Sequence, residues 1–213
     1  ARLAGCTPAA VICEIMRDDG TMARLPELCV FGEKYGIPVS TVADLIQHRL
    51  THETLVNEVA AADLPSRHGN FQVRVFHSKV DRRDHVVFQL GDLDPDSATL
   101  VRVHRANLVW DTFGRFRSED DGILNQALGA IEREGSGVLL YLEHEDRRWG
   151  GMGGRTESSS VMPFRSFGIG AQVLRALGLK KIRVLTKNPS PRAFVGLKAF
   201  GLEIDGFEIL ESG

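Results

Sequence analysis

The sequence predicts a mixed α+β and α/β fold, in which one mixed sheet is flanked by helices. Between residues 58 and 103, four strand-like runs alternate apolar and polar residues, as antiparallel strands with one solvent-facing side do. From Ile123 onward, strand and helix patterns alternate, which is typical of an α/β arrangement. Before residue 51, short helix and strand patterns precede this region, and we expect them to form a small α+β piece.

The first fifty residues combine helix and strand signals. In order, they predict a helix end at Ala1–Leu3 closed by Gly5, a strand at Ala10–Met16, a helix at Leu25–Tyr35 stopped by Gly36, and a helix that begins with the capping-box spacing Thr41–Asp44 and ends near Leu50. A junction at Leu50–Val56 is expected to separate two domains, residues 1–50 and residues 51–213.

The remaining elements follow from apolar periodicity. The predicted strands are Glu58–Leu64, Phe71–His77, His85–Leu90, Thr99–Val103, Val138–Leu142, Ile182–Thr186 and Leu202–Ile209. The predicted helices begin at Ile123, span Phe167–Leu177 and span Arg192–Phe200. A glycine- and serine-rich stretch, Gly150–Ser160, predicts a mobile surface loop.

Composition limits the classes of partner. A net charge of -2 gives no bulk attraction to nucleic acid or to a membrane surface, and no apolar run or signal peptide points to a membrane. The three cysteines, Cys6, Cys13 and Cys29, lack metal-type spacing, so we expect buried thiols in a cytoplasmic protein. Because the chain starts at Ala1 inside a helix-end pattern, we expect it to be the C-terminal part of a longer protein.

Glu14 stands inside an apolar run, where an unpaired charge would need a partner, a metal or a catalytic task. The alternative is a strand-end glutamate that reaches water. The surrounding sequence ARLAGCTPAAVICEIMRDDGTMAR, residues 1–24, resembles the end of 3,4-dihydroxy-2-butanone-4-phosphate synthase, and the likeness continues loosely to Arg49. The resemblance implies that Glu14 belongs to the ribulose 5-phosphate site.

The same resemblance implies that essential parts of the synthase lie upstream of Ala1. Its magnesium ligands, its acidic loop and its glycine-histidine-threonine-glutamate motif have no counterpart here. Enediolate chemistry of this kind needs a divalent metal. We therefore expect a parent protein that converts ribulose 5-phosphate to dihydroxybutanone phosphate and formate with magnesium, and we expect this chain alone to be inactive.

A second resemblance lies at residues 102–122, RVHRANLVWDTFGRFRSEDDG, which is similar to the zinc-binding loop of GTP cyclohydrolase II. The positions of the family's three zinc cysteines hold Asn107, Ser118 and Asp120, so we expect no zinc. LPSRHGNF, from Leu64, resembles the start of the cyclohydrolase domain.

Further motifs of that family survive in part. Glu145 and Arg147 match its nucleotide-contacting pair, whereas Pro163 replaces its catalytic aspartate. FGIGAQ, at Phe167–Gln172, keeps a family frame. The resemblance marks six residues as remnants of a nucleotide site: Arg102, His104, Glu145, Arg147, Arg165 and Thr186.

We interpret the second domain as a degenerate cyclohydrolase II-like domain, catalytically inactive and either structural, dimer-forming or regulatory, in a riboflavin-biosynthesis protein that is a homodimer. Two alternatives stay open. The surviving arginines would serve a nucleotide-binding sensor. His104 and Asp111 would serve a metal-independent enzyme with a new site, or a weak metal site of another kind.

Overall fold

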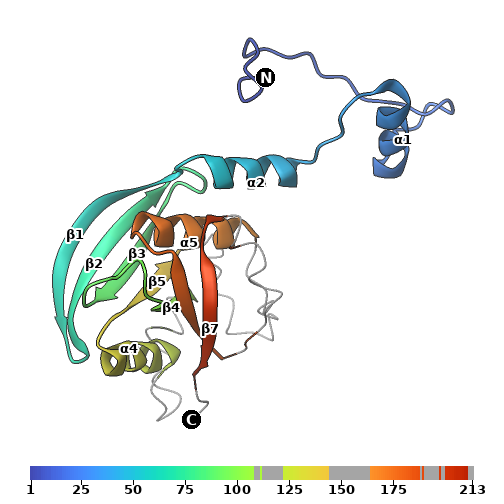
Figure 1. The fold of residues 1–213 in the computed structure, drawn as a ribbon. Helices are drawn as coiled ribbons and strands as arrows, with labels where there is room; N and C mark the ends of the chain where they lie inside the picture. Colours follow the sequence, from blue (N-terminus) through green and yellow to red (C-terminus); the bar gives the residue numbers. More distant parts are fainter. Residues whose placement is uncertain are drawn as a thin grey trace. The chain divides into compact units, whose positions relative to one another are not determined.

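The computed structural model describes residues 1–107, 111, 122–143, 164–187, 189, 197 and 200–210, without the side chains of residues 164 and 165. The chain divides into two compact units, Ala1–Leu45 and Ile46–Gly213, and each is described by itself (Figure 1). Among the described residues, no helix combines the length and the apolar character needed to cross a membrane.

Local sequence signals set the helix ends in residues 1–52. Helix α1, Leu25–Tyr35, ends where Gly36 turns left-handed at a φ of 64°. Helix α2, Val42–His52, begins with the predicted capping box, in which the Asp44 amide donates to the Thr41 hydroxyl at 3.1 Å. Near Ala1, the amides of Gly5 and Cys6 donate to the carbonyls of Arg2 and Ala1, which is the hydrogen-bond pattern of a Schellman helix end.

The predicted strand at Ala10–Met16 is wrong. Residues 10–15 adopt no regular structure, and Met16 forms only an isolated bridge with Met22. Val11 is 99% exposed and Ile12 is 93% exposed. A strand gains its stability from a neighbouring strand, and the described residues 1–45 offer none beside this run.

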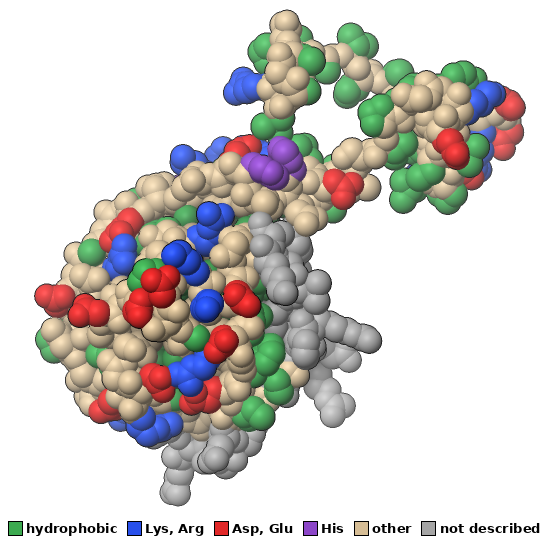
Figure 2. Space-filling model, in the orientation of Figure 1, with side chains coloured by type: hydrophobic (Ala, Val, Ile, Leu, Met, Phe, Trp, Pro, Cys, Tyr) green, Lys and Arg blue, Asp and Glu red, His purple; other side chains and the backbone are tan. Residues whose placement is uncertain are grey.

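The prediction of buried thiols is also wrong, because Cys6, Cys13 and Cys29 are all exposed free cysteines. Of residues 1–45, only Gly32 is buried, so this unit has no interior that could enclose a thiol. Apolar side chains instead lie on its surface (Figure 2), among them Leu3, Val11, Ile12, Met16, Val30, Tyr35 and Ile37.

A seven-stranded mixed sheet organises the described part of the second unit, with the strand order β1-β2-β3-β5-β4-β6-β7. The strands are β1 Val56–Ser66, β2 Gly69–Ser78, β3 Arg83–Leu90, β4 Thr99–Arg105, β5 Gly137–Leu142, β6 Lys181–Thr186 and β7 Glu203–Ile209. Neighbours from β1 to β5 in this order pair antiparallel, and neighbours from β5 to β7 pair parallel. The predicted mixed sheet is confirmed, and each predicted strand after residue 57 agrees to within two residues at each end.

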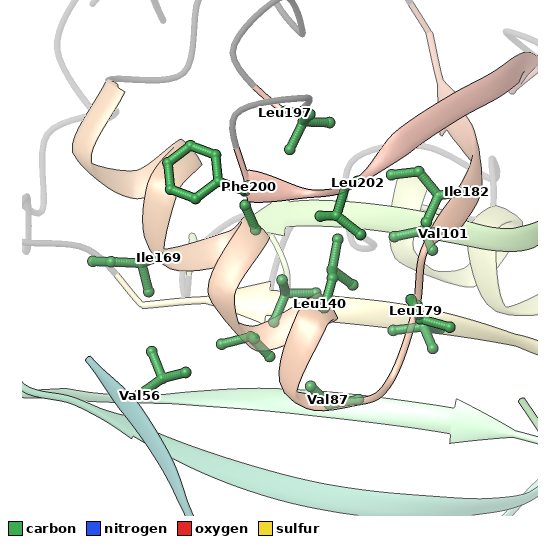
Figure 3. Close-up of a cluster of buried hydrophobic side chains, with 14 of the residues drawn as sticks. Val56, Val87, Val101, Leu140, Ile169, Leu179, Ile182, Leu197, Phe200 and Leu202 are labelled. Carbon is green, nitrogen blue, oxygen red and sulfur yellow. The ribbon is translucent and has the colours of Figure 1, made fainter. Parts of the chain in front are cut away.

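Helices α4, Ile123–Glu134, and α5, Phe164–Ala176, cover opposite faces of this sheet. Successive strand residues point to opposite faces, so Leu139 packs in the core cluster of α4 and Leu140 in that of α5. Figure 3 shows the α5 cluster, in which Val101 and Leu140 of the sheet lie with Ile169 of the helix. The arrangement brings the carboxyl ends of β4, β5 and β6 to one edge of the sheet.

Two predicted segments lie largely outside the described residues. They are the helix Arg192–Phe200, of which Leu197 and Phe200 are described and buried, and the loop Gly150–Ser160. The visible face of the second unit mixes acidic and basic side chains (Figure 2).

Candidate functional site

Two aromatic side chains meet at the carboxyl ends of β4 and β5. The parallel register of these strands places His104 beside Tyr141, and their rings stack with centroids 5.5 Å apart. Residues at the carboxyl ends of parallel strands are where open α/β sheets commonly bind ligands. The position of this pair therefore makes it the first candidate for a functional site.

Asp111 completes the cluster by accepting hydrogen bonds from three directions. His104 Nε2 lies 3.0 Å from its Oδ1, and its Oδ2 accepts from the Asn107 amide and from the Tyr141 hydroxyl, both at 2.8 Å. We call His104, Asp111 and Tyr141 the strand-end cluster. The sequence analysis named His104 and Asp111 together as a possible site, and the structure brings these two residues into contact.

The surroundings of Asp111 favour the charged form of its carboxylate. Burial of Asp111 opposes its charge, but the hydrogen bonds from His104, Asn107 and Tyr141 outweigh burial and hold the pKa of Asp111 below its usual value. Burial, the hydrogen bond to Asp111 and the nearby negative charge raise the pKa of Tyr141. Asp111 is thus an anion already occupied by donors, and Tyr141 is a neutral donor, so neither is poised to exchange a proton near neutral pH.

Arg102 lies two residues before His104 on the same face of β4 and reaches towards β6. Its Nη1 donates to the Leu185 carbonyl at 3.0 Å, while its buried Nε has no hydrogen-bond partner among the described atoms. Burial lowers the pKa of Arg102. The hydrogen bond from Nη1 therefore ties the Arg102 side chain of β4 to the backbone of β6.

The other predicted remnants are only partly placed. Thr186 ends β6, where its carbonyl accepts from the Leu210 amide at 3.0 Å. Glu145 and Arg147 lie outside the described residues, and so does the side chain of Arg165, whose backbone is in α5. Glu14 is exposed in the first unit.

Tyr141 was not singled out from the sequence. It is the only residue with a polar side-chain atom in the apolar run Val138–Leu142, which is the signal that could have marked it. Its role depends on the β4–β5 register, a long-range relationship that local patterns do not contain.

The donor set at the zinc-cysteine positions does not fit a thiolate zinc site. Asparagine and serine are poor zinc ligands, and one carboxylate, Asp120, cannot replace three thiolates. The Asn107 amide donates to Asp111, and Ser118 and Asp120 lie outside the described residues. In the part of the chain that the structure describes, no three His, Cys, Asp or Glu side chains are grouped to hold a metal ion.

Comparisons with known proteins connect this geometry to a family. The sequence profile of GTP cyclohydrolase II matches residues 57–208, and that of 3,4-dihydroxy-2-butanone 4-phosphate synthase matches residues 1–48. The riboflavin biosynthesis protein RibBA of Aquifex aeolicus is 40% identical, over 96% of this chain and 54% of its own length. RibBA of Chlorobium phaeovibrioides is 37% identical, over 96% of this chain and 53% of its own length.

A solved structure is similar along the whole chain. The crystal structure of RibBX, a two-domain 3,4-dihydroxy-2-butanone 4-phosphate synthase from A. baumannii, aligns with a TM-score of 0.64 and 28% identity, over 100% of this chain and 56% of that one. The chain thus spans about half the length of the curated relatives it matches. By its match over residues 57–208, the chain belongs to the GTP cyclohydrolase II family, and a 3,4-dihydroxy-2-butanone 4-phosphate synthase segment precedes that domain.

Proposed function

We propose that this chain is the C-terminal half of a cytoplasmic, homodimeric riboflavin-biosynthesis protein. Its upstream part, completed by residues 1–50, converts ribulose 5-phosphate to 3,4-dihydroxy-2-butanone 4-phosphate and formate with magnesium. The cyclohydrolase II-like domain, residues 51–213, does not open the ring of GTP and serves a structural or regulatory role.

The distribution of cysteines carries this proposal. The last cysteine of the chain is Cys29, so the cyclohydrolase II-like domain contains no thiolate at all. A catalytic zinc needs three strong protein ligands with one position left for the activated water. Without the family's three thiolates, the domain lacks the ligand set that would hold the family's zinc and its activated water.

Three further observations support the loss of cyclohydrolase activity. Pro163 stands at the position of the family's catalytic aspartate and cannot transfer a proton. Asp111 is already engaged by His104, the Asn107 amide and Tyr141. The similar RibBX is described as a two-domain synthase, which favours the same division of labour here.

The test uses the full-length parent protein. We expect formate release from ribulose 5-phosphate with magnesium, no consumption of GTP, and no stoichiometric zinc in metal analysis. A triple variant, Asn107→Cys, Ser118→Cys and Asp120→Cys, is the matched control, because it restores thiolates at the three family positions. GTP turnover by the unmodified protein, or stoichiometric zinc lost on Asp120→Ala, would refute the proposed loss of function.

A further inference from the structure

Gly168 and Gln172 of helix α5 contact the end of helix α2 and the residues that follow it, and we call these two residues the socket. The Gln172 side chain is 7% exposed, and its Oε1 accepts from the Leu55 amide at 2.8 Å. Its Nε2 donates to the carbonyls of Leu50 and Glu53, at 2.5 and 2.8 Å. One amide group therefore bonds three backbone groups of residues 50–55.

These backbone groups need an outside partner. The last carbonyls of a helix have no intrahelical donor, and α2 ends at His52. A buried carbonyl or amide left without a partner is costly, so a buried side chain that offers both donors and an acceptor is required here. Glutamine supplies this combination, which neither an acid nor an apolar residue of the same size can.

Gly168, one helical turn before Gln172, forms the apolar part of the socket. A Cβ at this position would lie 2.6 Å from Leu50 Cδ1 and 3.3 Å from Leu50 Cγ, and Leu50 itself is 2% exposed. A Cβ at Gly170, by contrast, would meet Leu142 Cδ1 at 3.5 Å, an ordinary contact. The absence of a side chain at Gly168 is thus what lets Leu50 pack against α5.

Helix α2 depends on this anchorage. It has 11 residues, and Leu50 is its only buried residue. Isolated helices shorter than about 12–15 residues are marginal in water, so tertiary packing decides whether such a helix forms. Its first residues, Val42–Leu45, belong to the first compact unit, whereas Leu50 belongs to the second.

We propose that Gly168 and Gln172 form a docking site for the junction segment 50–55, and that this site keeps helix α2 folded.

Hydrogen exchange of the 213-residue chain tests the docking site. Gln172→Ala and Gly168→Ala are expected to accelerate exchange of the α2 amides about tenfold, the size expected when a buried hydrogen bond or close contact is lost. Gly170→Ala is the matched control, in the same motif and helix, and should leave α2 protected. Unchanged α2 exchange in both socket variants, or equal acceleration in the control, overturns the proposal.

A double variant keeps the test decisive if a single substitution loosens the whole domain, as faster exchange in β4 would reveal. Combining Gly168→Ala with Leu50→Ala removes the side chain that the new methyl group would strike. The effect of Gly168→Ala on unfolding is therefore expected to be smaller in the Leu50→Ala background. Simple additivity of the two substitutions contradicts the socket.

Discussion

The Tyr141 hydroxyl donates a 2.8 Å hydrogen bond to Asp111, although 30 positions separate the two residues in the chain. The same carboxylate accepts from His104 at the end of β4, so Asp111 joins the ends of two adjacent strands. The polar atoms of the strand-end cluster therefore satisfy one another. This favours a role in fold stability for His104 and Asp111, which the sequence analysis also considered as a new catalytic site.

Replacing the carboxylate with an amide tests that role. Asp111→Asn keeps the shape but turns one acceptor into a donor, which faces the existing donors of Asn107 and Tyr141. We expect the free energy of unfolding to fall by about 1–3 kcal/mol, measured by urea denaturation at neutral pH. Asp63→Asn, at an exposed position of β1, is the control and should change little. Equal stability of the two variants would contradict the role assigned to Asp111.

The pH dependence of this effect has a defined sign. Hydrogen bonds hold the native pKa of Asp111 below its unfolded value, so they contribute stability above about pH 4. This contribution is lost as the pH falls through the native pKa. The stability difference between the wild type and Asp111→Asn should therefore shrink below about pH 4. Urea denaturation as a function of pH measures it, and a difference that grows with acid would exclude the mechanism.

His85 provides a second titration, in a different window. It is 1% exposed on β3, and neither ring nitrogen has a hydrogen-bond partner among the described atoms. Its Nε2 lies 3.4 Å from Asp81 Oδ2. Burial lowers the pKa of His85, although the charges of Asp81, Asp84 and Glu143 act in the opposite direction. The imidazole is therefore neutral in the folded protein at neutral pH.

Because the unfolded chain takes up this proton first, stability should fall as the pH drops below about 6.5, and the slope should level off below the native pKa. His85→Leu removes the titrating group and should flatten this part of the stability profile. His77→Leu is the control, since His77 is more exposed and pairs with Asp84 at 2.7 Å. An unchanged slope in His85→Leu would show that other groups cause the pH dependence.

Much of the fold could be predicted because the local patterns match buried surfaces. In β5, Leu139 and Leu140 face different core clusters, so the continuous apolar run of that strand reflects burial on both sides. The run at Ala10–Met16 has a similar composition but no neighbouring strand in the described residues, and the strand prediction failed there. Composition indicates whether a segment favours a buried or an exposed position, whereas the pairing of one strand with another depends on residues far away in the sequence.

The site shows the same limit. His104 and Asp111 are seven residues apart, and a sequence motif already associated them. Gln172 bonds the Leu50 carbonyl across 122 positions. The FGIGAQ motif that contains Gln172 resembles a family motif, but the motif alone did not indicate this contact. The close approach of the Leu50 side chain to Gly168 likewise depends on where Leu50 packs, which only the assembled fold determines.

The resemblance of the first unit to the synthase leads to a prediction about Glu14 in the full-length parent. Its carboxylate is expected to exchange a proton during enolisation of the sugar phosphate. Glu14→Gln keeps the shape and the hydrogen-bonding ability but cannot exchange that proton. Because general acid–base groups typically contribute about 10²–10⁴-fold, formate release from ribulose 5-phosphate with magnesium should fall by that factor.

The comparison that decides the role of Glu14 is Glu33→Gln, an equally conservative change at an exposed position of α1 in the same unit. Both variants should keep the thermal melting temperature of the parent, because both side chains are exposed in this structure and neither exchange removes packed surface. A catalytic role lowers the turnover of Glu14→Gln alone, at unchanged stability. A glutamate that merely reaches water leaves both variants active, so near-normal formate release by Glu14→Gln would remove this residue from the mechanism.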